Sequence, residues 1–157
     1  GDSVISKAEK ENWLDKGGFM VKDDCIFCKL AGGIIPTASL YEDDDFRVIL
    51  DAGPASRGHA LILPKQHYQD ICELDEAVGA KVLGLAARIG KAMKSGLGCA
   101  GFNLVQNNGE AAGQTVMHFH MHIIPRYEGG PQMVAWNPGT IEEEDVKQIV
   151  QAVQAYL

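Results

Sequence analysis

Short runs of alternating apolar and polar residues fill the middle of the chain and predict β-strands. They cover residues 39–42, 46–50, 59–63, 102–106 and 117–124, and turn-forming residues separate them. Between the third and fourth runs, apolar residues recur at helical spacing from Asp75 to a stop at Gly96 and Gly98. Strands in succession, interrupted by one main helix, predict an α+β fold with an antiparallel sheet of about five strands.

Both ends of the chain carry signals for terminal helices. Ser6-Lys7-Ala8-Glu9 has the form of a capping box and predicts a short helix that stops at Gly17 and Gly18, although a disordered arm fits equally well. A second box at residues 140–143 predicts a C-terminal helix. The expected organisation is an N-terminal arm or short helix over residues 1–22, a central domain over 23–139, and a helix over 140–157 that packs on the same domain.

Composition narrows the class of protein without deciding the function. The chain has 157 residues, of which 46% are hydrophobic and 22% charged, as expected for one globular domain. The net charge of −7 opposes binding to a nucleic acid polymer through a broad basic surface. No apolar run reaches the roughly 20 residues of a membrane span, and no signal-peptide core is present. We therefore expect a cytoplasmic protein without a membrane partner, and any phosphate ligand to be small.

Three of the five histidines lie two residues apart in the segment His118-Phe119-His120-Met121-His122. On a strand, alternate side chains share a face, so the three imidazoles would line one face at intervals of roughly 6.6 Å. That spacing suits contacts with different atoms of one ligand and does not suit convergence on one metal ion. A half-exposed strand with an accidental polar face is the alternative, but strand polar faces more often carry Thr, Lys or Glu.

The other two histidines lie in the segment from Gly58 to His67, and a Gly-rich segment from Asn107 to Thr115 precedes the three. Together these segments resemble the histidine triad (HIT) nucleotide-binding family, whose signature is His-x-His-x-His-x-x with apolar residues at x. The resemblance covers roughly residues 25–139 and includes both Hint-like proteins and bacterial HIT hydrolases. It implies a HIT-like fold, with the domain of residues 23–139 as the HIT domain, and a homodimer in which two sheets join into one.

The resemblance also implies catalytic roles for three histidines. The middle histidine of the triad, His120, would attack the α-phosphorus of a nucleotide and form a nucleotidyl-histidine intermediate that water hydrolyses. In the family a backbone carbonyl fixes the tautomer of this ring. His122 and His59 resemble the hydrogen-bonded pair beside the nucleophile. The sequence does not identify which of the two donates a proton to the leaving group.

Substrate-binding residues follow from the same resemblance. Asn107, Gln114 and Thr115 match phosphate-binding positions, Asp51 matches the carboxylate that binds the ribose, and Trp136 matches a tryptophan that reaches towards the partner subunit's site. Without the resemblance, residues 107–115 would be interpreted as a flexible loop and Asp51 as a turn residue. Four apolar positions match the pocket for the base and would otherwise be assigned to the core: Ile26, Phe27, Leu30 and Ile49.

The pair Cys25-x-x-Cys28 is compatible with a redox motif, half of a zinc site, or two reduced core residues. Some HIT proteins bind structural zinc through two cysteines at this spacing, and the matching histidines here are His67 and His118. The resemblance therefore implies a site made of Cys25, Cys28, His67 and His118, and no organic cofactor. Cys72 and Cys99 are expected to be core thiols. The acidic triplet at residues 43–45 is expected to form a solvated turn.

These observations favour a hydrolase that attacks the α-phosphorus of purine nucleoside phosphoramidates, anhydrides or dinucleoside polyphosphates. A nucleotidyltransferase or phosphorylase, which passes the nucleotidyl group to an acceptor other than water, is the alternative among enzymes. A nucleotide-binding or partner-binding protein with incidental catalysis is the alternative from another class. A metalloenzyme that uses the three triad histidines as ligands is disfavoured by their strand spacing.

Overall fold

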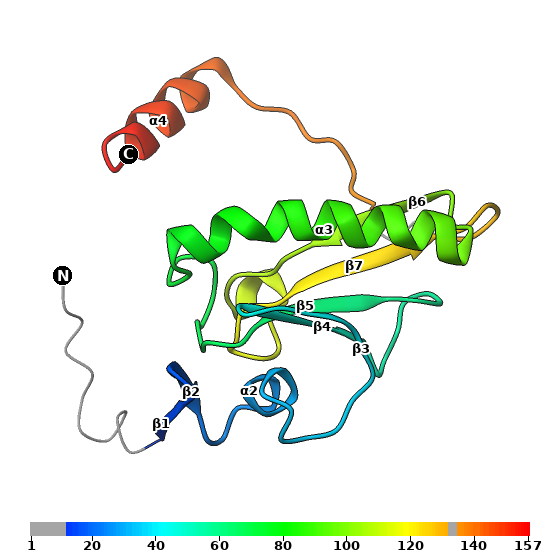
Figure 1. Ribbon diagram of the computed structural model, residues 1–157. Coiled ribbons are helices and arrows are strands. Elements are labelled where there is room, and N and C mark those ends of the chain that lie inside the picture. Colours follow the sequence, from blue (N-terminus) through cyan, green and yellow to red (C-terminus); the bar gives the residue numbers. More distant parts are fainter. Residues whose placement is uncertain (1–11, 132–134) are drawn as a thin grey trace.

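In a computed structural model that describes residues 12–131 and 135–157, an antiparallel five-stranded sheet lies between helices (Figure 1). The strand order is β3-β4-β5-β7-β6. The sheet strands are β3 (Ser39–Glu42), β4 (Phe46–Leu50), β5 (Ala60–Pro64), β6 (Gly101–Val105) and β7 (Met121–Arg126). The other elements are β1 (Trp13–Lys16), β2 (Phe19–Lys22), α2 (Ile26–Ala31), α3 (Glu76–Leu97), η1 (Glu110–Ala112) and α4 (Glu143–Gln154). The predicted α+β class, main helix and sheet are confirmed.

Alternation along the strands builds a separate core on each face of the sheet. On β5, Ala60 and Ile62 pack in the large core beneath α3, whereas Leu61 and Leu63 pack against α2 on the opposite face. The long helix α3 is held at both ends: the Asp75 carboxylate accepts backbone N–H groups of the first turn, and Gly98 ends the helix in the left-handed conformation. The sheet therefore separates two environments, and the site lies on the α2 side.

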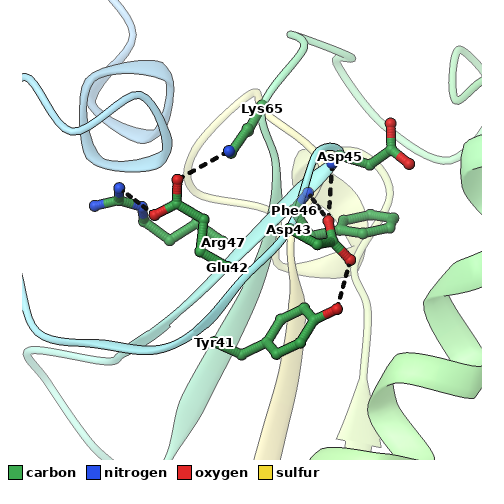
Figure 2. Close-up of polar contacts among 7 residues, drawn as sticks. All are labelled: Tyr41, Glu42, Asp43, Asp45, Phe46, Arg47 and Lys65. Carbon is green, nitrogen blue, oxygen red and sulfur yellow. Dashed lines mark hydrogen bonds and ion pairs between the residues drawn. The ribbon is translucent and has the colours of Figure 1, made fainter.

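The acidic triplet forms the turn between β3 and β4, as predicted (Figure 2). One oxygen of Asp43 accepts the backbone N–H groups of Asp45 and Phe46, both at 2.8 Å, and its other oxygen accepts the Tyr41 hydroxyl. These bonds lower the pKa of Asp43 against the opposing effect of burial. The triplet is thus a structural turn that fixes the register of the two strands.

The expected N-terminal helix is wrong for the part of the arm that the structure describes. Residues 13–22 form an antiparallel hairpin of β1 and β2, and Ser6–Glu9 lie outside the described residues. Gly17 and Gly18, interpreted above as a helix stop, both have positive φ and occupy the two central positions of the hairpin turn. Two such glycines suit a type I′ turn, which is a strong hairpin signal.

The C-terminal helix forms, but two of its expected features are wrong. It begins at Glu143 after Glu142, so Thr140 is not its N-cap. Its residues are all exposed, and Figure 1 shows the helix standing apart from the sheet and α3 rather than packed on them. None of the helices in residues 12–131 and 135–157 is both long enough and apolar enough to cross a membrane.

A glycine of α3 allows the helix to lie close to β6, and its replacement tests this packing. A Cβ atom on Gly90 would overlap the Phe102 ring, so we expect Gly90→Ala to lower the free energy of unfolding by about 1–3 kcal/mol. Gly84, in the same helix, has open space at that position, so Gly84→Ala should raise stability by up to about 1 kcal/mol. Urea unfolding of both variants measures the difference. Equal effects would show that the Phe102 contact does not limit this helix.

Candidate active site

The triad segment keeps its alternation of faces but is a strand only in part. β7 begins at Met121, so the expectation that all three histidines lie on one regular strand is wrong for His118 and His120. Before that point, the Phe119 N–H bonds the Tyr68 carbonyl instead of a neighbouring strand. Phe119 still packs in the core under α3, while Phe27 of α2 contacts the rings of both His118 and His120 from the other side.

A pocket of about 360 Å³ opens on this second face, between α2, the end of β4 and the triad segment. Its lining contains eight of the expected site residues: Ile26, Phe27, Leu30, Ile49, Asp51, Thr115, His120 and His122. It also contains Thr37, Leu50, Ala52 and Leu61, which the sequence analysis did not identify. Leu61 shares the inner face of its strand with His59, a signal that strand alternation could have supplied.

His120 is held in one tautomer. Its Nδ1 lies 2.8 Å from the carbonyl oxygen of His118, and because a carbonyl only accepts, Nδ1 carries the hydrogen. Nε2 of the neutral ring is therefore the nitrogen with a free lone pair. Burial lowers the pKa of His120, against the opposing effect of the hydrogen bond to the His118 carbonyl. The ring that lines the pocket is thus uncharged and nucleophilic at neutral pH.

A backbone amide sets the tautomers of the other two histidines. The Ala55 N–H donates to His59 Nδ1 at 2.9 Å, so the hydrogen of neutral His59 lies on Nε2. That group donates to His122 Nδ1 at 2.8 Å, which leaves the hydrogen of His122 on its own Nε2. Burial lowers the pKa of His59, and burial together with His120 and His59 lowers the pKa of His122 to about 4. Both rings are therefore neutral at pH 7, with hydrogen positions fixed by one peptide group.

The hydrogen bond from the Ala55 N–H to His59 argues against a metal ion beside His59 and His122. Oxygen Oδ2 of Asp51 lies 3.5 Å from His59 Nε2 and 3.9 Å from His122 Nδ1, so the three side chains are close enough to share an ion. A ligand nitrogen must offer a lone pair, however, and the Ala55 N–H already occupies the other nitrogen of His59. Nε2 of His59 could bind a metal only by losing its hydrogen. The arrangement fits a proton-bearing pair better than a metal site.

The loop before the triad is built by Gln114, whose expected role needs correction. Its side chain is buried, accepts the Gly109 N–H at 2.8 Å and donates to the carbonyls of Gln69 and Val116. The amide therefore holds the loop together instead of pointing into the pocket. Of the three residues expected at the phosphate, only Thr115 lines the pocket, and Asn107 does not. Trp136 is 76% exposed and lies outside the lining in this subunit.

Beside the pocket, Cys25, Cys28, His67 and His118 converge as expected. Nδ1 of His118 lies 3.5 Å from the Cys25 sulfur, 3.4 Å from the Cys28 sulfur and 3.2 Å from Nδ1 of His67. Nε2 of His118 lies 3.0 Å from the Pro64 carbonyl, so it carries the hydrogen and Nδ1 offers its lone pair to the cluster. Separations of this size match the edges of a tetrahedron around a zinc ion. The donor set therefore fits a closed, four-ligand metal site.

The cysteines also differ in proton affinity within this cluster. Cys25 caps α2 and accepts the Cys28 N–H at 3.4 Å. A hydrogen bond from the Cys28 side chain, together with His118 and His67, lowers the pKa of Cys25. Cys25 and burial raise the pKa of Cys28. Cys99 is buried, as expected, but Cys72 is exposed, so its assignment as a core thiol is wrong.

The hairpin of β1 and β2 covers the four residues Cys25, Cys28, His67 and His118, which we call the metal-ligand cluster. The sequence did not reveal this role of the hairpin. The Met20 carbonyl accepts the His67 N–H at 2.8 Å, and Trp13 packs edge-on against the His67 ring. The Lys22 N–H points to the Cys28 sulfur at 3.4 Å, and Val21 is buried with both cysteines. The expected arm is therefore part of the cluster's environment.

Comparison with known proteins agrees with this geometry. The family model for the HIT domain matches residues 33–129. An adenosine 5′-monophosphoramidase of Schizosaccharomyces pombe is 37% identical over 83% of this chain and 96% of its own length. An adenylylsulfatase of Arabidopsis thaliana is 45% identical over 69% of this chain and 55% of that protein. The chain belongs to the HIT family.

Solved structures support the same assignment. A HIT family protein of Bacillus anthracis is 37% identical and covers 86% of this chain and 98% of its own, with a TM-score of 0.79. A zinc-bound histidine triad family protein of Mycobacterium smegmatis is 34% identical, covers 84% of this chain and 94% of its own, and has a TM-score of 0.67. The fold predicted from the sequence is thereby confirmed.

The lowered pKa of His122 predicts a pH dependence of stability. With a folded-state pKa of about 4, against an ordinary value of 6.5, protonation favours the unfolded chain. This contribution to stability is complete above about pH 6.5 and is lost as the pH falls towards 4. His122→Gln removes the group, so the midpoint of urea unfolding should fall less between pH 6.5 and 4 than in the unsubstituted protein. Parallel curves for the two proteins would contradict the shift.

Proposed function

We propose that the protein hydrolyses adenosine nucleotides linked through the α-phosphorus to a nitrogen or oxygen leaving group. The observation that carries this proposal is the hydrogen bond between Nδ1 of His120 and the His118 carbonyl, because it leaves Nε2 of a buried, neutral ring free to attack. The names of the two relatives, a monophosphoramidase and an adenylylsulfatase, describe reactions of this class. We take both adenylyl substrates as the first candidates.

The lining of the pocket supports a position for each part of the nucleotide. The base would lie among Ile26, Phe27, Leu30 and Ile49, which form its apolar side. Asp51, at the end of β4, would accept the ribose hydroxyls. The phosphate would then meet the Thr115 hydroxyl and the Nε2–H of His122, whose hydrogen is held in place by the chain from Ala55 through His59.

The reaction would proceed in two displacements. Nε2 of His120 attacks the α-phosphorus, a phosphorus–nitrogen bond forms, and the leaving group departs with the electron pair of its bond. The imidazolium of the intermediate keeps its Nδ1–H on the His118 carbonyl. Water then attacks the same phosphorus, the phosphorus–nitrogen bond breaks with its electron pair returning to Nε2, and AMP, a proton and neutral His120 are released. His122 donates a hydrogen bond to the phosphoryl oxygen through both steps, since its hydrogen faces away from His59.

Replacement of the nucleophile tests this proposal. We expect His120→Ala to lower kcat for adenosine phosphoramidate on the order of 10³-fold or more, because no other group forms the covalent intermediate. Binding of AMP, measured by calorimetry, should change little, since the base, ribose and phosphate contacts remain. Radiolabelled adenylate should be trapped on the unsubstituted protein and not on the variant.

Three outcomes would count against the hydrolase. An active alanine variant would exclude His120 as the nucleophile. Turnover that requires an added acceptor would indicate a nucleotidyltransferase or phosphorylase, and tight nucleotide binding without turnover would indicate a binding protein. A panel of adenosine phosphoramidate, adenylyl sulfate, dinucleoside polyphosphates and nucleotide sugars, with and without acceptors, distinguishes them.

We also propose that the metal-ligand cluster holds one structural zinc ion. The four ligand atoms lie within 4.8 Å of one another, Nδ1 of His118 offers its lone pair to the cluster, and a zinc-bound relative shares the fold. Four protein ligands leave no coordination position for water, so the ion would stabilise the fold and take no part in the reaction. It would join α2, the segment after β5 and the triad segment.

Elemental analysis provides the test of the zinc proposal. We expect about one zinc per chain after dialysis against a weak chelator. Cys28→Ala should lose the metal and unfold at a lower temperature, whereas Cys72→Ala, which changes an exposed thiol outside the cluster, should keep both metal and stability. A metal-free protein with the same melting temperature would refute the proposal.

A homodimer formed through α3 and β6 remains our proposal for assembly. β6 is an edge strand of the sheet, and its Leu104 side chain is 40% exposed. Leu83, two helical turns before Gly90 and therefore on the same flank of α3, is 64% exposed. An open edge flanked by exposed leucines fits a two-fold interface in which two sheets become one.

A further inference from the structure

Helix α4 presents an apolar stripe that its own subunit does not cover. The stripe consists of Val146, Ile149, Val150 and Val153, which follow the spacing i, i+3, i+4, i+7 on one helix face. Their exposed fractions are between 42% and 55%. A helix of 12 residues without a capping hydrogen bond from its N-cap side chain is marginal in water unless one face packs against something. The stripe therefore requires a partner surface.

A surface of matching shape lies beside α3. An apolar groove of about 410 Å³ runs between the C-terminal half of α3 and the strands β3 and β4. Its α3 wall has the same four-position spacing in Ile89, Ala92, Met93 and Gly96, and the small residues among these allow a second helix to approach closely. Leu40 and Leu50 form the opposite wall and are 49% and 44% exposed. The groove lies on the flank of α3 away from β6, so it is separate from the proposed two-fold interface.

The charges of the two helices are also complementary. α3 contains four basic residues and one acidic residue, whereas α4 contains three acidic residues and one basic residue. Arg57 lines the groove, and Arg88 stands at its β3 side over the Tyr41 ring at 5.1 Å. The three acidic residues of α4 all lie in its first turn. An apolar stripe with an acidic end thus faces an apolar groove with basic edges.

The connection to α4 favours a groove on another subunit. Pro131 lies on the β6 side of its own subunit, because its carbonyl accepts a bond from Arg126, whose guanidinium also donates to Asn103 of β6. Pro131 is therefore on the flank that carries the proposed two-fold interface and away from its own subunit's groove. Figure 1 shows α4 carried clear of its own sheet and α3. We propose that α4 docks in the α3 groove of a second copy of this chain, so that two subunits exchange arms.

Paramagnetic broadening in mixed samples of the full chain tests this proposal. The spin label is attached to Gln151→Cys, which lies off the stripe, in a Cys72→Ser background that removes the exposed thiol. Spin-labelled chains at natural isotope abundance are mixed with ¹⁵N-labelled chains that carry no spin label. We expect the amide signals of Ile89, Ala92 and Leu97 in the ¹⁵N chains to lose intensity, because only a second copy can bring the label to them.

Two matched substitutions decide whether the apolar stripe of α4 causes the docking that broadens these signals. Ile149→Glu places a charge in the stripe and should abolish the broadening, whereas Gln148→Glu adds the same charge on the opposite face of α4 and should leave it unchanged. Broadening only when label and ¹⁵N share one chain would overturn the exchange in favour of docking within a subunit. Two results would overturn the docking of the stripe altogether. One is the absence of broadening both in the mixed sample and in chains that carry the spin label and ¹⁵N together. The other is broadening that survives Ile149→Glu.

Discussion

The hydrogen bond from His120 to the carbonyl of His118 connects the two halves of the site. His118 contributes its imidazole to the metal-ligand cluster and its carbonyl to the ring of the proposed nucleophile. The position of that carbonyl depends on where the His118 side chain is anchored, and therefore on Cys25, Cys28 and His67. In the proposed mechanism, a cluster that takes no part in the reaction thus determines which nitrogen of His120 is available for attack.

Much of the fold followed from the sequence because its signals are local. Alternation of apolar and polar residues predicted the strands of residues 39–42 and 46–50. Helical spacing and capping predicted the helix that begins after Asp75. All these signals act over a few residues. The start of the regular strand at Met121 was not predictable. It depends on the hydrogen bond from the Phe119 N–H to the carbonyl of Tyr68, which is far away in sequence. The hairpin at Gly17 and Gly18 was missed although it is local, since paired glycines also end helices.

The candidate site shows the same division between residue identity and geometry. Residue types were sufficient to single out the histidines and the cysteine pair, whereas the expected residues of the pocket lining came largely from the family resemblance. They could not show that the Gln114 amide is consumed within its own loop, because any amide in a Gly-rich segment is equally able to bind a phosphate. Nor could they show that the backbone N–H of Ala55 donates to His59, because any residue type other than proline has such a group.

The hairpin of β1 and β2 has a consequence for how a metal would enter and leave. Two strands of four residues are too short to be stable alone, so the hairpin depends on its contacts with His67 and Cys28 and on the burial of its own Val21 against the two cysteines. It should therefore open at a much lower free energy than the sheet does, in a local unfolding event that exposes both thiols. The exchange rate of the ion would then be set by the frequency of this opening, while the sheet and the nucleotide pocket remain folded.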